Sequence, residues 1–221
     1  MSIADKLTTI AENVQKVYDA GKAAGDGGGP NPLQYATKLQ SLYDGAVFPD
    51  GYELLLDVPC ATSLANTFMN MQGAIKITLK GNTAQSLVGM TYTFRTASLE
   101  VLDASEFYLK PSTMVYAFNG ATSLVSVLGE WDVSECTSFN LTFNKCYELQ
   151  EIRFKPQTLS LSISFSNSSK LSDISIQSIV DGLADLTEQT AQTLTLHATV
   201  GAKLTDAQKA AATAKNWTLV Y

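Results

Sequence analysis

Residues 118–127 read FNGATSLVSV, and residues 143–152 read FNKCYELQEI. In both segments an apolar residue follows the phenylalanine six positions later, and another follows three positions after that. Closely related arrangements occur five times in the chain, 22 to 26 residues apart, with anchors at Phe68, Phe94, Phe118, Phe143 and Phe165. A fixed period in the twenties predicts a solenoid, in which neighbouring units bury one another's apolar faces.

Each repeated unit is expected to contain two short strands joined by turns. Residues 90–94 and 114–118, which lead into two of the anchors, alternate in polarity as strands do. The segments after the anchors, such as residues 149–154, predict the second strand. By the same alternation, Tyr92 and Tyr116 should share the anchors' face and lie in the core.

The N-terminal region is predicted to be an amphipathic helix over residues 1–24. Its apolar residues follow a heptad seam rather than a broad stripe, which favours self-association with a trimer preferred. A helix that docks on the rest of the chain remains the alternative. The seam residues, proposed as an oligomerisation surface, are Ile3, Leu7, Ile10, Val14 and Val17.

The remaining chain divides by composition and period. A Gly/Pro linker covers residues 25–32 and an N-terminal cap residues 33–62, the repeats run over 63–176, and a mixed α/β C-terminal cap covers 177–221. In the last piece we expect helices near residues 176–183 and 204–215 and strands near 193–197 and 217–221. Thr205 is the expected N-cap of the second helix, and Asn216 its stop.

Composition argues against several functional classes. Fifteen basic and 21 acidic residues give a net charge of −6 without a Lys/Arg cluster, which disfavours nucleic-acid binding. No stretch has transmembrane length, and no secretory signal is expected. Three cysteines without a CxxC pair and a single histidine, His197, indicate no metal site, cofactor or catalytic centre. Cys146 is expected to be a buried thiol.

One segment is a candidate for ligand contact. Residues 129–134 extend the third unit as a predicted loop, and Trp131 stands there between Glu130 and Asp132. A flat aromatic side chain beside carboxylates is typical of sugar-binding surfaces. The alternative is that Trp131 packs inside, as tryptophan usually does.

The repeats resemble BspA-like leucine-rich repeats. Residues 118–127 and 143–152 look like the family's AFxxCxSLxxI unit, with the family's cysteine at Cys146. Residues 2–18, 193–197, 204–208 and 215–219 resemble the ends of repeat proteins of bacteriophages and prophages of Gram-positive and gut bacteria. The resemblance implies a mainly β, BspA-like leucine-rich-repeat solenoid of about five units with an N-terminal α-helix and the C-terminal cap.

The expected function is that of a non-enzymatic virion component, in a tail fibre, a baseplate or the particle surface, that attaches to a host. Its partners would be a protein or glycan on the host cell and other virion proteins through the N-terminal helix. Trimeric display would raise the avidity of weak contacts. The alternatives are a bacterial cell-surface adhesion protein and an intracellular protein-binding scaffold.

Overall fold

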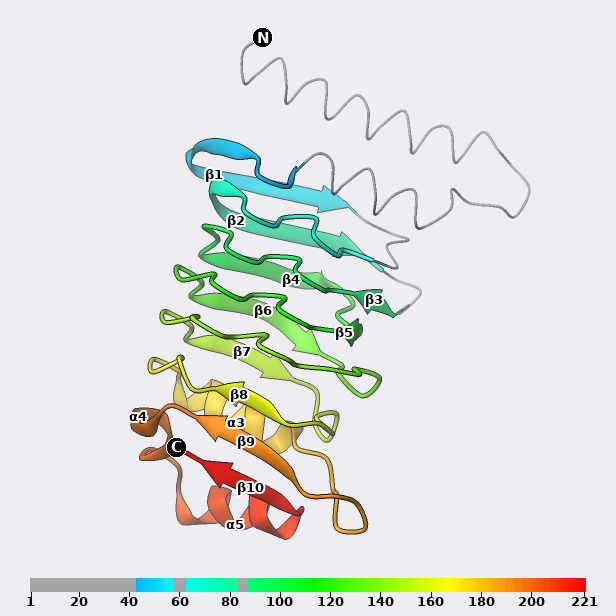
Figure 1. Cartoon of the computed structure of the whole chain (residues 1–221), viewed down its shortest axis with the longest axis vertical. Helices are drawn as coiled ribbons and strands as arrows, with labels where there is room; N and C mark the ends of the chain where they lie inside the picture. The colour runs from blue at the N-terminus through cyan, green and yellow to red at the C-terminus, as the bar shows by residue number, and fades with distance from the viewer. Residues whose placement is uncertain (1–42, 58–62, 83–86) are drawn as a thin grey trace, which may run out of the picture.

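The computed structural model describes residues 43–57, 63–82 and 87–221. Its largest element is a five-stranded parallel sheet whose strands follow chain order, as Figure 1 shows. Four of the strands each follow one anchor phenylalanine of the sequence period, and the first strand precedes all the anchors, so the sheet is built in the order of the chain. In sheet order the strands are β1 (Val47–Asp57), β2 (Gln72–Gly81), β4 (Val101–Phe107), β6 (Ser126–Trp131) and β7 (Glu151–Phe154).

A core of equivalent side chains packs against one face of this sheet. Ile77, Leu102 and Val127 are paired in register across β2, β4 and β6, and all are buried. The five anchor phenylalanines form a continuous column in the same core. Their neighbouring ring centroids are 4.8 to 5.6 Å apart, with planes within 20° of parallel. This spacing follows the distance between hydrogen-bonded strands, so each layer contributes one stacked ring.

The anchors belong to a second wall of the core that is built from turns. In residues 91–96, alternate backbone N–H groups bond in two directions. The N–H of Tyr92 donates to the carbonyl of Val115 in the next layer at 3.0 Å, whereas the N–H of Thr93 donates back to Met90 at 3.3 Å. The wall is therefore hydrogen-bonded between layers, as a sheet is, without having strand conformation.

This arrangement needs a left-handed backbone at two positions in each turn, two residues before and two residues after the anchor. In four successive turns these residues have φ between 51° and 77°. They are Asn66 and Asn70, Tyr92 and Thr96, Tyr116 and Gly120, and Leu141 and Lys145. Side chains on either side of such a residue do not alternate between two faces as they would on a strand.

The predicted fold class is therefore wrong. The described residues form parallel sheets, with 34% strand and 14% helix, and they show no leucine-rich-repeat solenoid. The strands expected over residues 90–94 and 114–118 are turns. Tyr92 and Tyr116 are partly exposed rather than in the core, because their left-handed backbone turns them away from the anchors. The N-terminal helix, its five seam residues and the linker lie outside the described residues.

The C-terminal part continues the stack with a three-stranded parallel sheet in the order β10-β9-β8. A two-stranded sheet, β3 (Val88–Gly89) with β5 (Pro111–Thr113), lies among the turns. The other elements are β8 (Ile163–Phe165), α3 (Asp173–Gly182), β9 (Gln192–Leu196), α4 (Ala198–Gly201), α5 (Asp206–Ala214) and β10 (Trp217–Val220).

Local predictions for this part are confirmed. Strands β9 and β10 and helix α5 lie where they were expected. Thr205 caps α5 in a reciprocal capping box with Gln208. Asn216 has a φ of 64° directly after the helix end, which is the conformation that stops a helix.

Helix α3 covers the outer edge of the five-stranded sheet. The backbone N–H of Ile152 donates to the hydroxyl of Ser175, and the N–H of Phe154 to the hydroxyl of Ser178, each at 3.0 Å. Ser175 donates in turn to the carbonyl of Gln150 at 2.9 Å. Side-chain hydroxyls on one face of α3 thus satisfy backbone groups of β7 that a further strand would otherwise bind.

Candidate functional site

A groove opens where strands β4 and β6 separate. Their ladder runs from Val101–Ser126 to Asp103–Leu128 and resumes at the bridge between Leu109 and Trp131. Between these pairings, residues 104–108 of one strand lie opposite only residues 129–130 of the other. The longer segment bulges away from the shorter one and leaves a groove of about 630 Å³.

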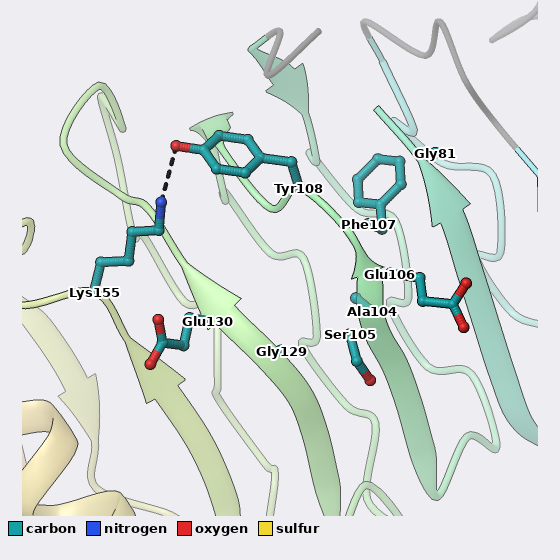
Figure 2. A pocket seen from close by; sticks show the side chains of 9 residues that line it. All are labelled: Gly81, Ala104, Ser105, Glu106, Phe107, Tyr108, Gly129, Glu130 and Lys155. Atoms are coloured by element: carbon teal, nitrogen blue, oxygen red, sulfur yellow. Dashed lines mark hydrogen bonds between the residues drawn. The ribbon is translucent and has the colours of Figure 1, made fainter. Parts of the chain in front are cut away.

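The groove is lined by side chains from the carboxyl ends of four parallel strands, drawn in Figure 2. Gly129 is required because the backbone of β4 leaves no room for a side chain at this position. Its φ is +101°, and a Cβ atom there would lie 2.7 Å from the carbonyl oxygen of Ala104. The lining residues are Gly81, Ala104, Ser105, Glu106, Phe107, Tyr108, Gly129, Glu130 and Lys155.

A polar cluster holds one side of the groove. The hydroxyl of Tyr108 donates to Asp132 Oδ2 at 2.8 Å and accepts from Lys155 Nζ at 3.0 Å, as Figure 2 shows for the lysine. The ammonium lies 4.0 Å from Asp132 Oδ2 and 4.4 Å from the centre of the tyrosine ring. These contacts tie together the ends of β4, β6 and β7.

Both charged groups of this cluster are held in their ionised forms. The hydrogen bond with Tyr108, together with the charges of Asp132 and Glu130, raises the pKa of Lys155 above its ordinary value. Burial disfavours the Asp132 carboxylate, but hydrogen bonds from Ser134 and Tyr108 outweigh it and hold the Asp132 pKa below its usual range. The cluster is therefore a fixed pair of opposite charges at neutral pH.

The hydrogen bonds that Asp132 accepts from Tyr108 and Ser134 should make the free energy of unfolding depend on pH. Since its folded-state pKa is lowered, its contribution is present above the unfolded-state pKa, near 4, and is lost as pH falls through the folded-state value. We expect Asp132→Asn to lower the free energy of unfolding by about 1 kcal/mol at pH 7 and to have less effect at about pH 2. Urea unfolding at both pH values measures this difference. Asp50→Asn, at an exposed site in β1, is the control, and an equal loss at both pH values would contradict the assignment.

The structure separates the three residues of the predicted ligand-contact loop. Glu130 is exposed and lines the groove, whereas Asp132 is partly buried in the polar cluster. Trp131 is fully buried, with its ring 5.9 Å from Phe118 in an edge-to-face contact. Residues 129–131 belong to β6 rather than to a loop. Trp131 is therefore a core residue. This position corrects the prediction that Trp131 contacts a ligand and agrees with the alternative, that it packs inside.

Sequence reasoning did not identify Lys155 and Glu106 as groove residues. Lys155 directly follows β7, and Glu106 is near the end of β4. A usable signal was present, because the carboxyl ends of parallel strands meet at one edge of a sheet. This signal can be used only when the ends of the strands are predicted correctly. Residues 101–107, which form β4, were not predicted as one continuous strand.

Other reactive groups in the described ranges lie away from the groove or are inert. Burial raises the pKa of Cys136 to about 11 and that of Cys146 to about 12, so both are neutral thiols and Cys146 is buried as expected. His197 caps α4 by accepting from the N–H of Thr199. Among residues 43–57, 63–82 and 87–221, no three His, Cys, Asp or Glu side chains are placed to hold a metal. Nor is any described helix long and apolar enough to cross a membrane.

Comparisons with protein-family models, with curated proteins and with solved structures find no match, so the groove is interpreted from its own geometry.

Proposed function

We propose that this protein is a non-enzymatic binding component of a virion surface, used for attachment to a host, and that the groove between β4 and β6 is one of its contact regions. The observation that carries the proposal is the rigid polar lining of the groove. Tyr108, Asp132 and Lys155 satisfy one another, while Glu130 and Glu106 extend an exposed carboxylate on either side. A surface fixed in this way binds without paying for side-chain ordering.

The state of the groove's ionisable groups supports binding rather than catalysis. A nucleophilic lysine needs a lowered pKa, whereas that of Lys155 is raised. A general base needs a pKa near neutrality, whereas that of Asp132 is lowered. The resemblance of residues 2–18, 193–197, 204–208 and 215–219 to segments of phage repeat proteins supports a place on a particle. An attachment protein needs recognition and rigidity, and the layered core supplies the rigidity.

The test combines detection in particles with cell binding. Antibodies against the full chain should label purified particles from the host culture in immunogold electron microscopy. Fluorescently labelled full-length protein should bind host cells saturably in flow cytometry. Glu130→Lys should weaken this binding at least about tenfold, because it reverses the charge of an exposed groove carboxylate.

Glu188→Lys is the matched control, since Glu188 is also exposed but lies in the segment between α3 and β9. It should change cell binding by less than about twofold. Particles that lack the protein, or a full-length protein with no saturable binding to host cells, would overturn the proposed function. Equal effects of the two charge reversals would exclude the groove as the contact region.

A further inference from the structure

A second surface, separate from the groove, is formed by the wall of turns. We call it the turn face and define it as residues 65–70, 91–96, 115–120 and 140–145. These segments contain no aspartate or glutamate, although the chain has 21 acidic residues. Their charged residues are Arg95 and Lys145, and both are exposed. The turn face thus carries two positive charges of its own, and the carboxylate of Asp44 reaches its first turn, where it accepts from the side-chain amide of Asn70 at 3.5 Å.

The guanidinium group of Arg95 lies over two tyrosine rings. Its guanidinium carbon lies 5.3 Å from the ring centre of Tyr92 and 6.0 Å from that of Tyr116, and these two rings stack at 5.1 Å. Cation–π contacts of this kind restrain the side chain and leave its N–H donors directed elsewhere. Within the described part of the chain, Arg95 has no carboxylate partner among the ion pairs.

The chain's other arginine has different surroundings. Arg153 lies on β7 in the sheet, paired in register with Glu130 of β6. The two arginines therefore differ in what lies beside them, a glutamate for Arg153 and the rings of Tyr92 and Tyr116 for Arg95. The core lies between the sheet and the turn face, which places the sheet's carboxylates about one layer thickness, roughly 10 Å, away. Their repulsion is largely screened at physiological salt.

The spacing of the cations suggests the shape of the ligand. Arg95 and Lys145 come from turns two layers apart, and successive layers are separated by about 5 Å, so the two charges are about 10 Å apart. Between and beside them lie amides and hydroxyls, including Asn119, Asn144 and Thr96. A linear chain that carries hydroxyl groups along its length, with anionic groups among them, matches this order of side chains. DNA lacks such a run of hydroxyl groups, and its binding involves many cationic contacts, whereas the turn face offers two.

We propose that the turn face binds a linear anionic glycan and that Arg95 contacts its anionic group. Planar guanidinium groups bind carboxylates and phosphates through paired hydrogen bonds, so either can be the anion. The exposed edges of Tyr92 and Tyr116 add contact area next to that anion.

The experiment measures binding of the immobilised full chain to defined polymers by biolayer interferometry. The probes are poly(glycerol phosphate), polygalacturonate, dextran and oligothymidylate. We expect binding to one or both anionic glycans and none to dextran, with weaker binding as salt is raised from about 50 to about 300 mM. Comparison of the first two probes identifies phosphate or carboxylate as the recognised group. Arg95→Gln should weaken binding at least about tenfold, and Arg153→Gln by less than about twofold.

Equal binding to dextran, equal losses from the two arginine substitutions, or tighter binding to oligothymidylate than to either glycan would each overturn the proposal. Both substituted residues are exposed, and circular dichroism spectra that match the unsubstituted protein establish that the fold is retained. Cell binding separates this proposal from the attachment function. Host cells that bind the unsubstituted and Arg95→Gln proteins equally would leave attachment standing and exclude the turn face from it.

Discussion

Replacing Phe118 with alanine is expected to lower the free energy of unfolding by about 4 kcal/mol, a large share of the stability of a single domain. Phe118 is fully buried at the centre of the phenylalanine column. Its ring stacks on Phe94 at 5.1 Å and on Phe143 at 5.6 Å, and it contacts Trp131 edge to face. The cavity would open between two layers that are each hydrogen-bonded to the other, so neither can move in to fill it.

Urea unfolding followed by circular dichroism measures this loss, with Phe118→Leu as the graded control. Leucine keeps most of the volume but not the stacked ring, and we expect it to cost about 1.5 kcal/mol. The critical result is that Phe118→Ala lowers the free energy of unfolding more than Phe118→Leu does. A Phe118→Ala protein that loses less than about 1 kcal/mol would contradict a continuous column at this position.

Gly73→Ala is expected to cost about 3 kcal/mol or more, because the substitution meets both a conformational and a steric barrier. Gly73 has a φ of +83°, and a Cβ atom there would lie 1.9 Å from the carbonyl oxygen of Phe48. The obstructing atom belongs to the backbone of β1, so relief requires strands β1 and β2 to separate locally.

Gly51→Ala isolates the conformational part of this cost. Gly51 has a φ of +82°, almost the same as Gly73, but nothing lies within 4 Å of the added Cβ. We expect a loss of about 1 kcal/mol for Gly51→Ala, and thermal unfolding of both variants measures the difference. Similar midpoints for the two proteins would contradict the close approach of β1 to β2.

The parts of the fold that were predictable depend on short-range chemistry or on a repeated large side chain. The capping box at Thr205 and Gln208 lies within one helical turn, so the start of α5 could be read from four residues. The phenylalanine period could be recognised because one ring per layer is required to fill the core. Neither feature depends on how distant segments pair.

The turns were mistaken for strands because two conformations produce the same pattern of residue types. Polar and apolar residues alternate over residues 90–94, but Tyr92 in the middle has a left-handed backbone with φ of 57°, so the segment is a turn and not a strand. Asparagine or glycine would have signalled the left-handed positions, and Asn66 and Gly120 do occupy two of them. Tyrosine at positions 92 and 116 conceals the signal in the two middle turns.

The groove could not be predicted from the sequence because it depends on a difference in length between two strands. Five residues at the end of β4 and directly after it, 104–108, lie opposite two of β6, 129–130, between the same pairings. That mismatch is a property of pairing register, which no single segment contains. Glu130 was identified from its neighbours in sequence, whereas Lys155 joins it only in the folded structure.

The serine face of α3 ends the five-stranded sheet at β7. An uncovered parallel edge is a template on which another polypeptide can add a strand, and repeated addition produces fibres. Ser175 and Ser178 occupy the backbone groups of β7 that such a strand would need. A sequence built from near-identical layers could otherwise polymerise through the same contacts that fold it. Two hydroxyl groups on a helix thus close the β7 edge of a periodic sheet against the addition of another strand.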